Sequence, residues 1–201
     1  MLIGCSLWNT AQGTRVGGVV VETEAYVGPE DKASHAFGGR RTARVEAMYA
    51  QPGTAYVYFT YGTHFCMNVS CFAAGHPAAV LVRAIEPRVG LEVMSHLRGT
   101  NDPMKLCKGP GNLCRALGIH SAQNGINLCL DDSFCFTSQK RVHAGDLAKP
   151  LRIATTARIG IGDRGIWTRR RLRFFLNGSP FVSRLPSQRG TNKPSGNNPI
   201  S

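Results

Sequence analysis

Two glutamates and a tyrosine occupy every second position at the end of the segment VVVETEAY, residues 19–26. The preceding valines are typical of a buried β-strand, and side chains of a strand alternate between its two faces. Glu22, Glu24 and Tyr26 are therefore expected to point the same way, each about 7 Å from the next. Two carboxylates at this separation are typical of hydrolysis at a glycosidic carbon with inversion.

A lone arginine interrupts a second apolar strand. Residues 78–87 read AAVLVRAIEP, and Arg83 is the polar residue within the run VLVRAI. A buried guanidinium needs a carboxylate or a phosphate, because an unpaired one costs several kcal/mol. Glu22 and Glu24 have the complementary need. A structural salt bridge between the two strands and a catalytic cluster are both compatible with this pattern.

The tyrosines are concentrated in one part of the chain. All five lie between residues 26 and 61, in the same region as His35. Tyr56 is expected to pack in the core. Tyr61 differs, because it precedes Gly62 at a predicted turn, where there is no core to enter. An exposed aromatic side chain at such a tip usually contacts a ligand or partner.

The charge is divided unevenly. The chain of 201 residues has a net charge of +12, yet residues 1–102 hold eight basic and eight acidic residues, and residues 103–201 hold sixteen and four. One-sided basicity favours a polyanionic partner, either a nucleic acid or an acidic membrane surface. No apolar run approaches the length of a membrane span, and no secretory signal is apparent. We expect a protein that is neither secreted nor membrane-bound, located in the cytoplasm (nucleoid) of a bacterium or the nucleus of a eukaryote.

Seven cysteines occur without any CxxC pair. Cys66 and Cys71 with His76 could be drawn as a metal site, but buried reduced thiols are the more ordinary interpretation. We expect no disulfide, no metal and no cofactor.

The pattern of elements indicates a single α+β domain over residues 1–183, with a disordered tail at residues 184–201. There is no βαβ alternation, so the sheet should be curved and largely antiparallel, with peripheral helices. Residues 54–71 predict a protruding hairpin that turns at residues 61–64. Further strands are expected at 78–87, 151–162 and 171–177, and helices at 29–37, 42–49, 91–99 and 110–118.

Several longer runs resemble the alkyladenine (3-methyladenine) DNA glycosylases. They are VETEAYVGPEDKASHAFGGR, PGTAYVYFTYGTHFCMNVS, VLVRAIEP, GPGNLCRALGI, TARIGIG and RFFLNGSPFVS, and they span about residues 2–183. The resemblance implies a monomeric, metal-free enzyme that flips damaged purines out of double-stranded DNA. It would hydrolyse their N-glycosidic bonds and so initiate base excision repair. The implied lesions are 3-methyladenine, 7-methylguanine, hypoxanthine and ethenoadenine.

The resemblance also implies residue roles. Glu24 is the general base that activates water, and Arg83 and the carbonyl of Ile161 help to hold that water. Tyr26, His35 and Tyr58 surround the flipped base, and Asn68 discriminates against guanine. Tyr61 is the side chain that intercalates into the duplex. Glu22 carries no implied role and is interpreted as a structural partner. From their charge and position, we expect these arginines to contact phosphates: Arg44, Arg169, Arg170, Arg171 and Arg173.

Three alternatives use part of the same pattern. A non-enzymatic DNA- or RNA-binding module explains the charge but not the buried carboxylates. A polysaccharide hydrolase explains the carboxylate pair but not the basic second half. A fold relative could bind tRNA without glycosylase chemistry, because a fold does not determine a function.

Overall fold

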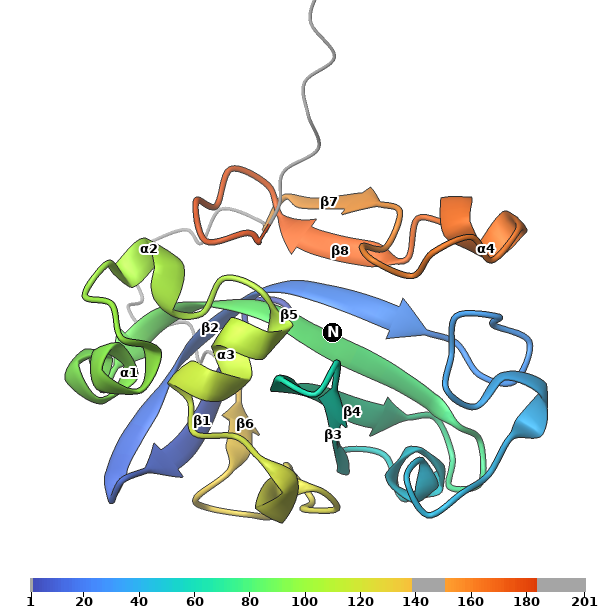
Figure 1. Cartoon of the computed structure of the whole chain (residues 1–201), viewed down its shortest axis with the longest axis horizontal. Helices are drawn as coiled ribbons and strands as arrows, with labels where there is room; N and C mark the ends of the chain where they lie inside the picture. Colours follow the sequence, from blue (N-terminus) through green and yellow to red (C-terminus); the bar gives the residue numbers. More distant parts are fainter. Residues whose placement is uncertain (1, 139–150, 184–201) are drawn as a thin grey trace, which may run out of the picture.

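A curved eight-stranded sheet forms the centre of the computed structural model, which describes residues 2–138 and 151–183 (Figure 1). The strand order is β3-β4-β5-β2-β1-β6, and β8 joins β2 and β7 beside this path. Every pairing among the described strands is antiparallel. The strands are β1 (Ser6–Ala11), β2 (Thr14–Tyr26), β3 (Ala55–Thr60), β4 (His64–Cys71), β5 (Ala78–Val89), β6 (Cys135–Thr137), β7 (Ile153–Thr156) and β8 (Arg173–Leu176).

Strand β2 changes partners along its length. Its first half lies between β1 and β5, and its last residues lie between β8 and β5. The change coincides with a register shift between Val20 and Glu22, which marks a β-bulge. A bulge re-aims the side chains that follow it. Val20 still belongs to the apolar core, whereas Glu22 begins the charged part of the strand.

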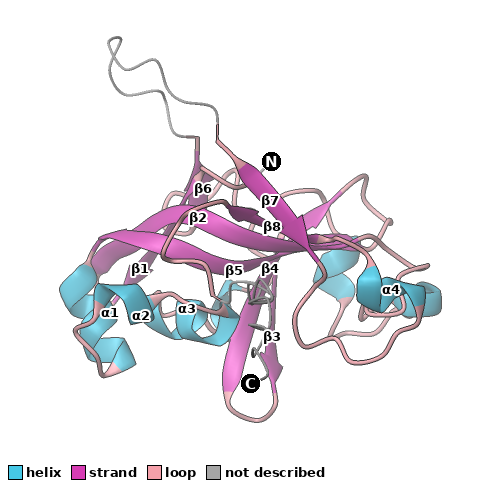
Figure 2. Ribbon diagram, turned by 90° about the horizontal axis from the view of Figure 1, so that it is seen from above, coloured by secondary structure: helices cyan, strands magenta, loops and turns pink. Residues whose placement is uncertain are grey.

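Three short helices pack against strands β2, β4 and β5 of the sheet. They are α1 (Leu91–Arg98), α2 (Pro103–Leu106) and α3 (Pro110–Ala116), and they gather on one side in Figure 2. Proline opens α2 and α3, where no hydrogen-bond donor is needed, and Gly99 ends α1 in the left-handed conformation. Leu106, Leu113 and Leu117 are fully buried in the main core. This packed core makes the sheet a rigid support for the side chains that project away from the helices.

The β3–β4 hairpin projects from the sheet between these helices and the loop that carries α4 (Ile166–Arg169) (Figure 2). Its strands pair in register from Ala55↔Val69 to Thr60↔His64, so residues 61–63 form the turn. Tyr61 lies at this tip with a φ of 52°. The predicted hairpin and turn are therefore present.

The other secondary-structure predictions are confirmed in part. Strands at 54–71 and 78–87 and helices at 91–99 and 110–118 are confirmed to within a few residues. The helix expected around His35 is wrong: the chain forms turns followed by a 3₁₀ segment, Phe37–Gly39. Gly38 and Gly39 there have positive φ, which interrupts a helix. Likewise, only Glu46–Tyr49 is helical in the segment expected from residue 42, and it is a 3₁₀ turn.

The strand expected over 151–162 is confirmed only at Ile153–Thr156, and β1 and β6 were not predicted. The proposed tail, residues 184–201, lies outside the described residues. Among the residues that the structure does describe, no helix is both long enough and apolar enough to cross a membrane.

Candidate active site

A cavity of about 400 Å³ opens between β2, the β3–β4 hairpin and the loop after β7. This volume is in the usual range for a pocket that holds a small molecule. Its wall contains every residue that the sequence predicted around a bound base, together with Arg83 and the hairpin tip: Tyr26, His35, Tyr58, Tyr61, Asn68, Arg83 and Ile161. Residues from four separate segments thus meet at one site.

Aromatic side chains form one side of this cavity. The rings of His35 and Tyr58 meet edge to face, with centroids 4.6 Å apart. His35 Nδ1 and the Tyr56 hydroxyl lie 2.8 Å apart at hydrogen-bonding distance. Partial burial of the ring, followed by the positive charges of Arg44 and Arg40, lowers the pKa of His35. A neutral imidazole is therefore favoured at this wall.

Asn68 lines the cavity and is buried. It lies on β4 opposite Tyr56 and donates a hydrogen bond from Nδ2 to the Tyr56 carbonyl over 3.1 Å. This bond fixes the plane of the side-chain amide. Tyr61, in contrast, is 82% exposed at the rim, which agrees with its predicted position at a tip without a core.

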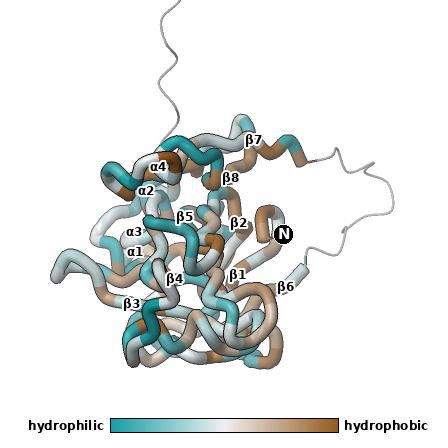
Figure 3. Tube along the Cα trace, turned by 90° about the vertical axis from the view of Figure 1, so that its right-hand side faces the viewer, coloured by the Kyte–Doolittle hydropathy of each residue, from teal (hydrophilic) through white to brown (hydrophobic). Residues whose placement is uncertain are grey.

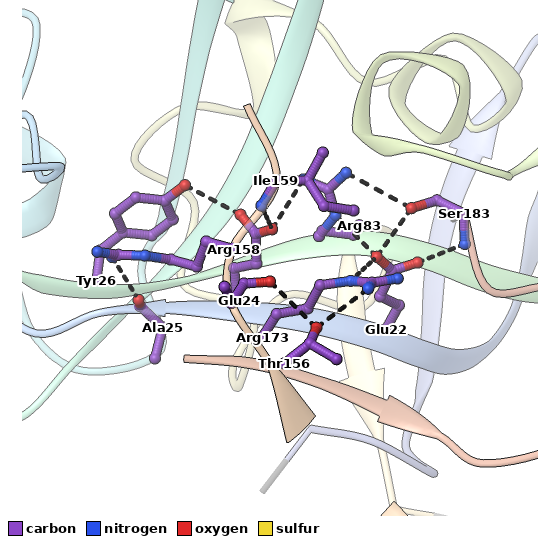
Figure 4. A network of polar contacts seen from close by, with 11 residues as sticks. Glu22, Glu24, Ala25, Tyr26, Arg83, Thr156, Arg158, Ile159, Arg173 and Ser183 are labelled. Atoms are coloured by element: carbon purple, nitrogen blue, oxygen red, sulfur yellow. Dashed lines mark hydrogen bonds and ion pairs between the residues drawn. The ribbon is translucent and has the colours of Figure 1, made fainter. Parts of the chain in front are cut away.

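Glu24 is fully buried, and Figure 4 shows the side chains that surround it. Its Oε1 accepts the N–H of Ile159 over 2.8 Å and lies 3.2 Å from Arg83 Nη1. Its Oε2 accepts the Tyr26 hydroxyl over 3.1 Å. An ionised carboxylate can accept about four hydrogen bonds, so these three donors leave one acceptor position of Glu24 unused among the described residues. All three donor residues line the cavity.

Burial dominates the titration of Glu24. It raises the pKa of the carboxyl, and the nearby Arg83, the Ile159 N–H and the Tyr26 hydroxyl only partly oppose it. A carboxylate with a raised pKa is a better proton acceptor than an ordinary one. Glu24 is therefore suited to accept a proton from water beside the cavity.

Glu22 is also fully buried, but it is enclosed by donors. Its Oε1 accepts from Arg83 Nε at 2.9 Å, from Arg173 Nε at 2.8 Å and from the Ser183 hydroxyl at 2.8 Å. The Ser183 N–H donates to Oε2. Burial raises the pKa of Glu22, but these donors outweigh it, so the pKa is lowered overall. The expected interstrand salt bridge is present, and Glu22 is not available as the second carboxylate of a sugar hydrolase.

The prediction that Arg173 contacts a phosphate is wrong. This residue is 2% exposed and pairs with Glu22. Side chains alternate along β8, so Arg173 and Phe175 point inward. The basic run RRRLR does not indicate this, because it makes Arg173 look like its exposed neighbours. The other four arginines expected on phosphates are exposed: Arg44, Arg169, Arg170 and Arg171. Figure 3 shows hydrophilic colour where the chain leaves α4, and contact with phosphates there stays a prediction.

Sequence reasoning missed two features behind the cavity. Ile159 was not singled out, although its N–H contacts Glu24. Arg158 and Asp31 form a fully buried ion pair next to Tyr26. Arg158 interrupts an otherwise uncharged run, ATTARIGIG, just as Arg83 does in its strand. The same argument could have identified it.

Comparison with known proteins agrees with this geometry. A sequence model of the methylpurine-DNA glycosylase (MPG) family matches residues 1–180. DNA-3-methyladenine glycosylase of Mus musculus is 45% identical over 86% of this chain and 53% of the relative, and that of Homo sapiens is 43% identical over 85% and 58%. A putative 3-methyladenine DNA glycosylase of Desulfitobacterium hafniense is 41% identical over 90% of both chains.

The chain thus spans little more than half of the mammalian relatives and nearly all of the bacterial one. The family match covers β1 to β8 and therefore includes every element that builds the cavity. The resemblance first indicated by the motifs around Glu24 and Tyr61 holds along the described domain. This chain belongs to the methylpurine-DNA glycosylase family.

Proposed function

We propose that this protein is a monofunctional DNA repair glycosylase that flips a damaged purine out of double-stranded DNA and hydrolyses its N-glycosidic bond. The observation that carries the proposal is the buried Glu24, held by three lining residues behind a cavity with aromatic walls. Family membership and the names of the relatives support it.

The proposed reaction begins with water held by Glu24. Arg83 and the carbonyl of Ile161 help to orient this water. Its oxygen attacks C1′ of the deoxyribose, the C–N bond breaks, and Glu24 takes the proton from water. The bonding electrons leave with the base: a cationic alkylated purine departs as a neutral molecule, whereas a neutral purine departs as an anion and takes a proton from solvent water. The products are a free purine and an abasic site, and no metal or redox partner takes part.

Charge development explains why a carboxylate belongs here. Cleavage of the glycosidic bond creates positive charge on the sugar, which a neighbouring anion stabilises. Arg83 shares its charge between Glu22 and Glu24. Arg173 is a second guanidinium partner of Glu22, so the cluster holds two carboxylates and two guanidinium groups. Burial nevertheless raises the pKa of Glu24 and makes its carboxylate more basic. Glu24 can therefore act both as a proton acceptor and as a compensating charge.

The cavity walls account for the proposed substrate class. Tyr26, His35 and Tyr58 offer ring faces and edges to a flipped purine, and alkylation at N3 or N7 gives that purine positive charge. Contact of a cation with an aromatic face is worth about 0.5–2 kcal/mol. Of the proposed substrates, 3-methyladenine and 7-methylguanine are cationic and gain from this contact. The other two, hypoxanthine and ethenoadenine, are neutral and would stack on the same rings without it.

Two further residues have proposed roles around the flipped base. Tyr61, exposed at the hairpin tip, fills the gap that the base leaves in the duplex. Asn68, fixed by the Tyr56 carbonyl, lies against the purine edge that carries the 2-amino group of guanine. Exclusion of guanine there would protect the abundant normal base.

A base-release assay on duplexes that each contain one defined lesion tests the proposal. We expect free base from at least one alkylated or deaminated purine and none from the matched undamaged duplex. Chromatography of the released base, with alkaline cleavage of the abasic strand, measures both products. Tight binding to the lesion duplexes without release of any base would contradict the enzymatic function and favour a binding module.

A further inference from the structure

Arg158 lies in the loop after β7 and is held on several sides (Figure 4). Its side chain is fully buried. Nη1 and Nη2 contact the two carboxylate oxygens of Asp31, at 2.5 and 2.8 Å, and Nη1 also donates to the Ala25 carbonyl at 2.9 Å. A bidentate pair of this kind fixes the plane of the guanidinium as well as its position.

Asp31 extends this contact to another segment. Its carboxylate accepts the N–H groups of Val27 and Ala33, at 3.3 and 3.0 Å, and so organises the turn that follows β2. That turn carries His35 to the cavity wall. The Arg158 guanidinium also lies 4.6 Å from the centre of the Tyr26 ring. Arg158 therefore contacts one cavity residue directly and reaches a second through Asp31.

Ile159, the residue after Arg158, contacts Glu24, the proposed general base. Ile159 donates its N–H to Glu24 Oε1, and Ile159, Gly160 and Ile161 all line the cavity. The side chain of Arg158 and this N–H belong to adjacent residues. Anchoring Arg158 to β2 and Asp31 therefore holds the peptide that contacts Glu24.

Stability alone explains this arrangement poorly. Replacing a buried ion pair by apolar residues is often neutral or stabilising. Moreover, Arg158 Nε is buried without a hydrogen-bond partner among the residues that the structure describes, which adds a cost. An expensive arginine that contacts Tyr26 directly and the His35 turn through Asp31 is better explained by its effect on the site.

We propose that Arg158 is a positioning residue: it locks residues 157–161 against β2 so that the Ile159 N–H stays on Glu24 while Tyr26 and the His35 turn keep the shape of the cavity. This inference rests on the proposed function for its catalytic consequence. The geometric part, control of the Ile159–Glu24 contact, does not require turnover.

Arg158→Lys is the first test, because lysine keeps the charge but cannot bind Asp31 through two nitrogens. We expect kcat on a single-lesion duplex to fall at least about tenfold, since a small misplacement of a catalytic contact has effects of this size. Binding of undamaged duplex should not change. The Glu24 carboxyl should titrate at a higher pH, because the Ile159 N–H stabilises its charged form.

The other groups that face Glu24 are Arg83, Tyr26 and Glu22. The substitution leaves Arg83 and Glu22 in place. It weakens the contact with the Tyr26 ring, and a displaced Tyr26 hydroxyl would also raise the pKa of Glu24, in the same direction as loss of the Ile159 N–H.

Carbon NMR of labelled glutamate in the free protein measures the titration without DNA. Arg98→Lys is the matched control: Arg98 also holds a buried residue, by donating from Nε to the Leu106 carbonyl, but it does not line the cavity. It should leave kcat and the Glu24 titration unchanged.

Asp31→Asn provides a second route if Arg158→Lys does not fold, since it keeps the shape of the partner and removes its charge. It should shift the Glu24 titration in the same direction. Wild-type kcat and wild-type Glu24 titration in a folded Arg158→Lys or Asp31→Asn variant would overturn the inference. If the wild-type protein releases no base, the proposed function fails, and the titration alone decides the role of Arg158.

Discussion

Glu22 and Glu24 lie two residues apart on β2, are both fully buried and share Arg83, yet their surroundings are opposite. Glu22 is enclosed by two guanidinium groups and both polar groups of Ser183. Glu24 has three partners, Arg83, Tyr26 and Ile159, and all three line the cavity. The pKa of Glu22 is lowered and that of Glu24 is raised. Identical side chains on one strand thus acquire different chemistry from their partners.

Glu24→Gln should have the largest effect. We expect base release to fall by about 10³-fold, because the amide cannot accept a proton from water. The shape of the site is kept, so binding to lesion DNA should remain close to that of the wild-type protein. Single-turnover release and duplex binding, measured on the same lesion, separate the two effects. Appreciable turnover by this variant would show that Glu24 is not the general base.

Glu22→Gln should act on stability instead. It removes a buried charge shared by Arg83 and Arg173, and breaking such a cluster costs about 3 kcal/mol. Urea unfolding measures the change, with Glu24→Gln as the matched control on the same strand. A catalytic loss in well-folded Glu22→Gln equal to that of Glu24→Gln would reverse the assignment of the pair.

The two carboxylates should also give opposite pH dependence of stability. Because the folded pKa of Glu22 is lowered, its stabilisation is present above its ordinary pKa of 4.5 and is lost as the pH falls through the lowered folded pKa. The folded pKa of Glu24 is raised, so its contribution is present below 4.5 and is lost as the pH rises through the folded value.

The free energy of unfolding of both glutamine variants, measured from pH 3 to pH 7 (about the range over which carboxylates titrate), checks these opposite signs. The penalty of Glu22→Gln should shrink toward low pH. Glu24→Gln should become more stable relative to the wild-type protein as the pH rises. Parallel curves for the two variants would show that the environments do not differ as the structure indicates.

Tyr61→Ala should weaken base flipping more than chemistry, because Tyr61 belongs to the rim of the cavity and makes no contact with either glutamate in the described residues. Loss of one stacking aromatic should reduce the flipped population roughly tenfold. The defect should be smaller on a mismatched lesion, where less stacking is lost. An equal defect on all substrates would place Tyr61 in the scaffold.

Asn68→Ser should have the smallest effect and a selective one. Removing the amide that is fixed by the Tyr56 carbonyl should raise release of normal guanine relative to hypoxanthine, with activity on both retained. Competition between the two bases in otherwise identical duplexes measures the ratio. An unchanged ratio in a folded variant would make Asn68 a structural residue that only bridges the hairpin strands.

Local sequence determined much of this protein. Strand alternation predicts that Glu22, Glu24 and Tyr26 share one face, the aromatic and β-branched run at 54–71 predicts the hairpin, and Pro110 and Gly99 mark helix ends. Each of these features depends on residues a few positions apart, so propensity and periodicity are sufficient. The motifs around Glu24 and Tyr61 also carried the family resemblance, which the comparisons confirmed.

The tertiary structure alone decided which charges meet. Arg173 looks like one more exposed arginine of a basic run, but it contacts Glu22, which is 151 residues away. Arg158 and Asp31 are 127 residues apart and have no local pattern that pairs them. Partners at such separations depend on the register of β2 with β5 and β8 and on the bulge near Glu22. A shift of one residue in a strand reverses the face of every side chain, so no local pattern can assign the separate roles of Glu22 and Glu24.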